Sequence, residues 1–171
     1  MMSVPITVYW DTLQYNTWTF HLGATDNGLC CITLPNERFD TLQEWVTKHV
    51  PGAGLIHDRT KMTLYLEQVQ EYLSARRKVF SVPLDLRGTP FQVKVWRALL
   101  EIPFGKTQSY SQISSNIGHP IAVRAVGATI GANPIPIVVP CHRVIAKNGK
   151  LTGYRGGVEM KAKLLRLEGI S

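Results

Sequence analysis

The stretch Asn133-Pro134-Ile135-Pro136-Ile137-Val138-Val139-Pro140-Cys141-His142-Arg143-Val144 is the part around which the rest of the chain is organised. Its three prolines fix φ and lack an N–H donor, so they predict an extended backbone and exclude a helix. The apolar residues 137–139 predict a short buried extended segment that ends at Cys141. A thiol followed directly by an imidazole and a guanidinium is a candidate nucleophile, because basic neighbours lower a thiol pKa.

The charge of the chain is divided unevenly. Residues 1–85 hold 7 Lys and Arg against 9 Asp and Glu, whereas residues 86–171 hold 12 against 3, so balances of −2 and +9 make up the net +7. The basic half predicts a polyanionic partner such as nucleic acid, and a merely soluble basic surface is the alternative. The shift falls inside a candidate linker at 79–88, so we expect two domains, 1–85 and 86–171.

Composition is that of a globular protein, with 44% hydrophobic and 18% charged residues. No apolar run approaches the ~20 residues of a membrane span, and residues 1–11 lack the pattern of a signal peptide. Three cysteines, two of them the adjacent Cys30 and Cys31, do not form a disulfide framework, and we expect a reducing compartment. His21, His49 and His57 show no metal-ligand spacing with a cysteine, so we expect them to be structural or surface residues. We expect no metal and no cofactor, although a metal site in the first half is left open.

The first half is expected to be a small α/β scaffold. Residues 6–10, 17–22 and 29–32 are rich in β-branched and aromatic side chains with turn formers between them, which predicts antiparallel strands. Apolar residues at helical spacing predict helices over 36–50 and 57–75. This half contains no motif that indicates a function.

The second half begins with two helix-start signals. Thr89-Pro90-Phe91-Gln92 predicts a helix over 90–101, and Ser109-Tyr110-Ser111-Gln112 predicts a short helix reaching 117. Gly118-His119-Pro120 is a turn, and a third helix is expected from 120 to about 131. Helix, glycine-containing turn and helix form a helix-turn-helix, although the same pattern occurs in plain helix packing.

The third of these helices is unusual in its small side chains. Only Arg124 could read a base edge in a major groove. The other residues of interest are small and would let a partner approach the helix backbone closely: Ala122, Ala125, Gly127, Ala128 and Gly131. A helix buried through its small residues remains the alternative.

Beyond Cys141 the chain is expected to form a hairpin, a loop and a helix. Residues 144–146 and 150–152 flank Lys147-Asn148-Gly149, whose Asn-Gly pair predicts a hairpin turn. Residues 153–157 are a glycine-rich loop. A final helix over 158–168 is expected to carry a basic face of Lys161, Lys163 and Arg166.

Pro140-Cys141-His142-Arg143-Val144, with Asn133-Pro134 before it and Gly153-Tyr154-Arg155-Gly156-Gly157 after it, resembles the O6-alkylguanine-DNA alkyltransferases, also called methylated-DNA–protein-cysteine methyltransferases. The resemblance covers roughly residues 88–169. It implies an α/β protein with a small N-terminal α/β domain, an antiparallel sheet plus helices that is ribonuclease H-like. A mostly helical, winged helix-turn-helix-like C-terminal domain would follow it.

The resemblance also implies an activity, which is DNA repair by direct damage reversal. The alkyl group of O6-alkylguanine in double-stranded DNA, with O4-alkylthymine left open, would pass irreversibly to Cys141 after base flipping, in a single turnover. His142 would be the base, acting through a water, and Glu168 would orient it. Tyr110 would push on the flanking phosphate and bond the flipped base.

Further roles follow from the same resemblance. Arg124 would fill the space in the base stack, and the small residues of its helix would lie in the minor groove without sequence readout. Asn133 would tie the DNA-facing elements together beside the active site. The base pocket would consist of the Val144 carbonyl and the loop of Tyr154, Arg155 and Gly156. Some family members carry serine where Arg155 stands, so a hydroxyl contact to O6 is missing here. Arg143 is expected to be an ion-pair partner.

Four other functions fit the sequence less well. A non-enzymatic damage binder of the alkyltransferase-like type would lack the acceptor cysteine, which this chain has. A cysteine hydrolase would need an oxyanion hole and a regenerating Cys–His pair, and a transcription factor would need base-reading side chains. An adaptive-response regulator would carry an extra domain. We expect a monomer without a membrane partner, with clustering on DNA left open, in the cytoplasm: nucleoid-associated in a prokaryote, or nuclear in a eukaryote.

Overall fold

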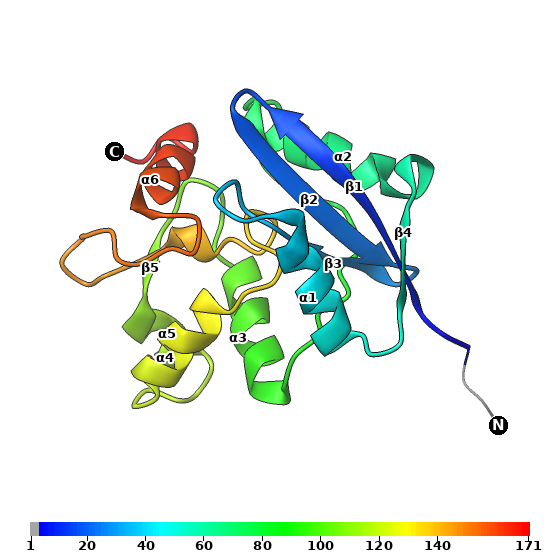
Figure 1. Cartoon of the computed structure of the whole chain (residues 1–171). Coiled ribbons are helices and arrows are strands. Elements are labelled where there is room, and N and C mark those ends of the chain that lie inside the picture. Colours follow the sequence, from blue (N-terminus) through cyan, green and yellow to red (C-terminus); the bar gives the residue numbers. More distant parts are fainter. Residues whose placement is uncertain (1–3) are drawn as a thin grey trace. The chain divides into compact units, whose positions relative to one another are not determined.

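The computed structural model describes residues 4–171 as two compact units, the first ending at Arg87 and the second running from Gly88 to Ser171 (Figure 1). The first unit contains a four-stranded sheet in the order β3-β2-β1-β4. β1 (Thr7–Tyr15), β2 (Trp18–Thr25) and β3 (Gly28–Ile32) pair antiparallel, and β4 (Gly54–His57) pairs parallel with β1. The predicted antiparallel strands are therefore confirmed.

Two helices cover opposite faces of this sheet. α1 (Phe39–His49) packs Leu42 and Val46 against Val8 and the buried Cys30 and Cys31. α2 (Arg59–Leu73) lies on the other face, where the Tyr15 hydroxyl donates to the carbonyl of Leu73 at 3.1 Å. Val8 and Tyr15 differ by an odd number of positions in β1, and alternate residues of a strand point to opposite faces.

Two predictions for the first unit were wrong in detail. Strand β4 was not expected, because it has four residues, follows a Pro51-Gly52 turn and is stabilised by a non-local parallel pairing with β1. Its last residue, His57, was assigned to the following helix, which instead begins at Arg59 after an Asp58 cap. α1 also begins later than residue 36, because Glu37 turns back and accepts from the Leu34 N–H at 2.8 Å.

The second unit is mostly helical, as expected. α3 (Pro90–Leu100) and α4 (Tyr110–Asn116) both begin with complete capping boxes, at Thr89 and Ser109. α5 (Val123–Gly131) follows α4 through a turn, and the Trp96 indole of α3 donates to the carbonyl of Thr129 in α5 at 2.9 Å. The remaining elements are a 3₁₀ turn, η1 (Cys141–Arg143), two short parallel strands, β5 (Gln108–Ser109) and β6 (Val144–Ile145), and α6 (Val158–Leu167).

Two predicted boundaries in the second unit differ from the structure. α5 begins at Val123 and not at Pro120, because Ala122 N–H closes a separate turn onto the His119 carbonyl at 3.0 Å. The predicted hairpin after Cys141 is present only as a turn with two hydrogen bonds. Gly149 N–H donates to the Ala146 carbonyl at 2.9 Å, and Ala146 N–H donates to the Lys150 carbonyl at 3.3 Å. β6 pairs with β5 instead of with residues 150–152, which are not a strand.

The prediction of an extended approach to Cys141 was also wrong. Residues 136–139 form a tight turn, closed by a hydrogen bond of 2.9 Å from Val139 N–H to the Ile135 carbonyl. Ile137 takes a φ of +75°, a left-handed conformation that is costly for a β-branched residue. The prolines do exclude a helix, but a turn satisfies the same restriction.

Across residues 4–171, every helix is too short or too polar to cross a lipid bilayer.

Candidate active site and DNA-binding surface

The Asn133 side chain holds the turn that presents Cys141. Its Oδ1 accepts from Ile135 N–H at 3.0 Å, and its Nδ2 donates to the Val139 carbonyl at 2.9 Å. Asn133 is 1% exposed, so both bonds are shielded from water. One buried side chain therefore fixes both ends of the turn and with it the backbone that enters η1 at Cys141.

The Cys141 thiol lies in a buried, positively charged environment. Burial raises the pKa of the thiol above its ordinary value, and hydrogen bonding with the Asn133 side chain and the charges of Arg155 and Lys161 oppose this rise. Cys141 is 8% exposed. The resting group is thus a protonated thiol, which a base must activate and which nearby cations would stabilise as a thiolate.

His142, Glu168 and Arg143 form a buried ionic network. His142 Nε2 lies 2.7 Å from Glu168 Oε2, and Arg143 binds the same carboxylate through Nε at 2.9 Å and Nη2 at 3.1 Å. Arg143 Nη1 also donates to the Ile102 carbonyl, and Gly105 N–H donates to Glu168 Oε1 at 3.0 Å. The expected ion pair of Arg143 is therefore present, and the carboxylate next to His142 is held from several sides.

The protonation states of this network suit a base. Burial lowers the pKa of His142, although Glu168 opposes the shift. Burial would raise the pKa of Glu168, but its hydrogen bonds with His142 and Arg143 outweigh that effect and hold it at about 2. At neutral pH the imidazole is therefore neutral, with Nε2–H donated to the Glu168 carboxylate and the lone pair on Nδ1. Such a ring can accept a proton, and the carboxylate stabilises the resulting cation.

Lys161 is a site residue that the sequence analysis missed. We expected it on the basic face of α6, yet it is 1% exposed, and its Nζ donates to the Thr152 carbonyl at 3.3 Å. Burial lowers the pKa of this lysine, whereas the proximity of Cys141 raises it. A signal was available, because Lys161, Leu164, Leu165 and Glu168 follow the spacing of a single helix face.

Tyr110 connects α5 to the segment that leads back to Lys161. Its hydroxyl lies 2.9 Å from Thr152 Oγ1. A Cβ atom at Gly127 would lie 3.8 Å from the Tyr110 ring, an ordinary van der Waals distance, so α5 passes near this ring. Thr152 is thus a shared hydrogen-bond partner of Lys161 and of Tyr110, the residue predicted to act on the flipped base.

The loop predicted to close the base pocket is linked to the Cys141 turn. Arg155 Nη1 donates to the Asn133 carbonyl at 2.6 Å, and Gly157 N–H closes a turn onto the Tyr154 carbonyl at 2.8 Å. Tyr154, Arg155 and Gly156 are all half-buried, whereas Val144 is fully buried at the start of β6. The structure therefore brings the Arg155 loop and the Asn133 turn together.

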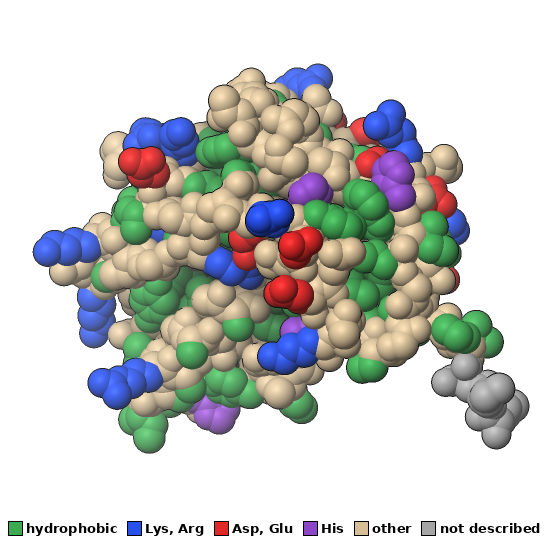
Figure 2. Space-filling view, viewed as in Figure 1, with side chains coloured by type: hydrophobic (Ala, Val, Ile, Leu, Met, Phe, Trp, Pro, Cys, Tyr) green, Lys and Arg blue, Asp and Glu red, His purple; other side chains and the backbone are tan. Residues whose placement is uncertain are grey.

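Arg124 and Cys141 differ in exposure, because Cys141 is buried whereas Arg124 is open to solvent. Arg124 is exposed on α5, together with Ala125, Ala128 and Gly131, whereas Ala122 and Gly127 are half-buried. The face of α5 that remains open to solvent thus carries small side chains and one guanidinium. Figure 2 shows Lys and Arg side chains projecting along the part of the surface formed by α4, α5 and residues 146–153. This surface suits close contact with a polyanion.

Within the described residues 4–171, we find no group of three or more His, Cys, Asp and Glu side chains that could hold a metal ion.

Comparison with known proteins assigns both units. Residues 8–86 match the ribonuclease-like domain of 6-O-methylguanine DNA methyltransferase, and residues 90–170 match the DNA-binding domain of the same family. The inducible methylated-DNA–protein-cysteine methyltransferase of Bacillus subtilis is 51% identical over 162 residues, which cover 95% of this chain and 90% of the relative. The chain belongs to the O6-methylguanine DNA methyltransferase family.

Further relatives support this family assignment. The Mycobacterium tuberculosis methylated-DNA–protein-cysteine methyltransferase is 55% identical over 103 residues, which cover 60% of this chain and 62% of that protein. A crystal structure of the Mycobacterium tuberculosis enzyme in complex with DNA superposes with a TM-score of 0.81 at 39% identity, covering 94% of this chain and 92% of that one. The resemblance, the fold class and a DNA-binding second unit are thereby confirmed.

Proposed function

We propose that the protein repairs DNA by moving the alkyl group of O6-alkylguanine to Cys141, irreversibly and once per molecule. The observation that carries the proposal is the buried Cys141 thiol beside a neutral His142, whose ring is bound to Glu168 at 2.7 Å. Membership of a family whose members are named methylated-DNA–protein-cysteine methyltransferases supports it.

The reaction begins with a proton transfer. His142 takes the proton of the Cys141 thiol, through a water as the family resemblance implies, and Glu168 stabilises the imidazolium. The positive charges of Lys161 and Arg155, which lower the pKa of Cys141, favour the thiolate that remains. Burial of this thiolate leaves it poorly solvated and therefore strongly nucleophilic.

The thiolate then attacks the alkyl carbon. A sulfur–carbon bond forms as the carbon–O6 bond breaks, and the electron pair stays on guanine. The proton that His142 took from the thiol then passes to guanine, which leaves His142 neutral again. The product is unmodified guanine and an S-alkyl cysteine. Because a thioether has no good leaving group, the acceptor is not regenerated and each molecule acts once.

The alkylated base must leave the duplex to reach a buried thiol, at a cost of a few kcal/mol. In our proposal α5 lies in the minor groove, where its small exposed residues allow close approach without sequence readout. Arg124 occupies the vacated stack, and Tyr110 with the loop of Tyr154, Arg155 and Gly156 receives the base. The protein acts as a monomer where DNA is found, in the prokaryotic cytoplasm or the eukaryotic nucleus.

The DNA product tests this function. The protein is mixed in increasing amounts with a duplex that contains one O6-methylguanine, and the nucleosides are quantified after digestion. We expect unmodified guanine to replace the lesion one for one with added protein. Loss of the lesion in excess of the protein would indicate turnover, and tight binding without loss would favour a non-enzymatic damage binder. Either result would contradict the proposal.

A further inference from the structure

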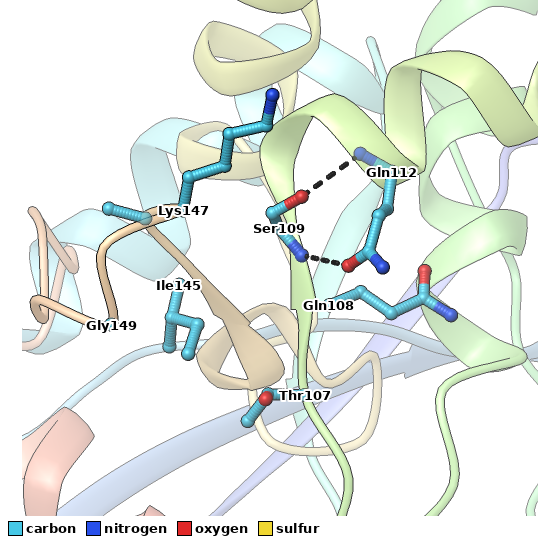
Figure 3. A pocket seen from close by; sticks show the side chains of 8 residues that line it. Thr107, Gln108, Ser109, Gln112, Ile145, Lys147 and Gly149 are labelled. Carbon is cyan, nitrogen blue, oxygen red and sulfur yellow. Dashed lines mark hydrogen bonds between the residues drawn. The ribbon is translucent and has the colours of Figure 1, made fainter.

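A cavity of about 300 Å³ lies in the second unit, between the start of α4 and the turn that follows β6 (Figure 3). It is lined by Thr107, Gln108, Ser109, Gln112, Ile145, Ala146, Lys147 and Gly149. The Ser109 and Gln112 side chains lie against each other at its wall, and Lys147 extends from the turn on the facing side.

Several hydrogen-bond donors of this cavity are unused. The Gln112 carbonyl oxygen accepts from Ser109 N–H at 2.7 Å, and Ser109 Oγ accepts from Gln112 N–H at 3.1 Å. This reciprocal cap uses the backbone donors of Ser109 and Gln112. It leaves the Gln112 amide hydrogens and the Ser109 hydroxyl hydrogen without an acceptor among the described residues, and the same holds for the Thr107 hydroxyl.

The charge of the cavity has one sign. Lys147 is the one charged side chain among the described residues that line it, and none of those residues is acidic. Side-chain donors and an ammonium group with no carboxylate are complementary to an oxyanion and unfavourable for a cation. The cavity is also large enough for a phosphate group with its first waters.

The position of the cavity relates it to the DNA-binding surface. Ser109 directly precedes Tyr110, whose ring lies near Gly127 of α5. An anion held here would lie beside the first turn of α4, in the same helix pair that presents Arg124. The anion that a DNA-binding protein meets at such a place is a phosphate of the nucleic acid backbone.

We propose that this cavity binds one phosphodiester group of the DNA strand, through Lys147 and the side-chain donors of Thr107, Ser109 and Gln112. The proposal rests on the DNA binding in the proposed function and adds a defined anchoring point to it. Phosphate contacts position a protein on DNA and carry no sequence information. The anchor therefore sets the register between the strand and Tyr110, and it acts equally on damaged and undamaged duplex.

The experiment couples two changes, one in the protein and one in the DNA. A series of duplexes carries a single neutral methylphosphonate at successive linkages around the O6-methylguanine. The dissociation constant of each is measured for the Cys141→Ala protein, in which no transfer occurs, and for the same protein with Lys147→Met or Thr107→Val added. Thr107→Val removes the hydroxyl at almost constant volume. Lys163→Met, which removes an exposed lysine on α6 that does not line the cavity, is the matched control.

We expect one linkage at which the methylphosphonate weakens binding about tenfold in the Cys141→Ala parent and in the Lys163→Met control. At that linkage the methylphosphonate should weaken binding to the Lys147→Met protein threefold or less, because the phosphate contact is already gone. Thr107→Val should show a smaller coupling of the same sign. Lys147→Met should also reduce the slope of log affinity against log salt by about 0.9, the value for one phosphate.

The proposal is overturned if Lys147→Met shows the same loss as its parent at every linkage. It is also overturned if inorganic phosphate, titrated by calorimetry, binds the cavity below about 1 mM while no linkage shows coupling, since the site would then serve a free anion. Methyl transfer by proteins that retain Cys141, measured at saturating duplex, separates the two proposals. Lys163→Met should leave its rate unchanged, whereas absence of transfer in the unaltered protein would contradict the proposed function and not this site.

Discussion

At the scale of single residues, the proposed alkyl transfer depends on the buried Cys141 thiol, whose ionisation is opposed by burial and assisted by nearby positive charge. Lys161 is the residue that tests this balance. It is buried, it donates to the Thr152 carbonyl, and its charge lowers the pKa of Cys141. A thiolate that depends on this charge should form less readily without it.

Lys161→Met should therefore raise the pKa of Cys141 and shift the acidic limb of the single-turnover rate profile upward by about one pH unit. That shift corresponds to about tenfold slower transfer at neutral pH. Transfer is measured from pH 6 to 9 at saturating duplex. Lys163→Met removes an equal charge from an exposed position of the same helix and should leave the profile in place. Superimposable profiles for Lys161→Met and the unaltered protein would refute the role of this charge.

Glu168 gives a second prediction, for stability. Its pKa is about 2 in the folded protein against an ordinary value of 4.5, so its stabilising effect is complete above about pH 4.5 and is lost as the pH falls toward 2. The shift corresponds to a free energy of unfolding on the order of 3 kcal/mol. Glu168→Gln should unfold more easily at pH 7, and its deficit should shrink as the pH approaches 3. Urea unfolding at several pH values measures this, and a deficit that stays constant with pH would count against the network.

At the scale of elements, α5 is the helix whose exposed face decides how closely DNA can approach. Ala128 is exposed on this face and its neighbours Ala125 and Gly131 are small. Ala128→Leu should weaken binding to duplex with and without the lesion by about tenfold or more, and should leave the melting temperature unchanged. Fluorescence anisotropy and thermal unfolding measure the two effects.

The control for this prediction is Gln43→Leu, which places the same side chain at an exposed position of α1. It should alter neither the affinity nor the melting temperature. If Ala128→Leu binds duplex as tightly as the control, α5 is not the helix that enters the groove.

The elements also show why the sequence predicted some features and not others. The starts of α3 and α4 were found because a capping box is a local signal, complete within the four residues from Thr89 and from Ser109. Strand β4 was missed because its stability comes from a parallel pairing with the distant β1. The sequence does not distinguish an extended segment from a turn over 136–139, because prolines restrict φ in both conformations. The side-chain hydrogen bonds of Asn133 select the turn.

Some residues of the candidate site could likewise be predicted from the sequence, and others could not. Cys141, His142 and Arg143 are adjacent in the chain and stand out as a motif, whereas Glu168 could be assigned only through the family resemblance. Its position beside His142 depends on how α6 packs onto η1. Lys161 shares a helix face with Leu164 and Leu165, which predicts its burial, whereas its proximity to Cys141 depends on how α6 packs.

At the scale of the whole molecule, the uneven charge predicts how binding responds to salt. The balance of +9 lies within residues 86–171. If the second unit contacts about six phosphates, affinity for duplex should fall about a thousandfold between 50 and 200 mM salt, because released counterions drive binding. Affinity that is independent of salt would contradict a phosphate-contacting surface.

The central claim is that Cys141 is the irreversible acceptor of the alkyl group. The most direct measurement is the intact mass of the protein after it is mixed with a duplex that contains one O6-methylguanine, followed by peptide mapping. The account predicts a gain of one methyl group per molecule, located on Cys141 and absent in Cys141→Ala. An unchanged mass despite lesion-selective binding, or a methyl group on another residue, would contradict it.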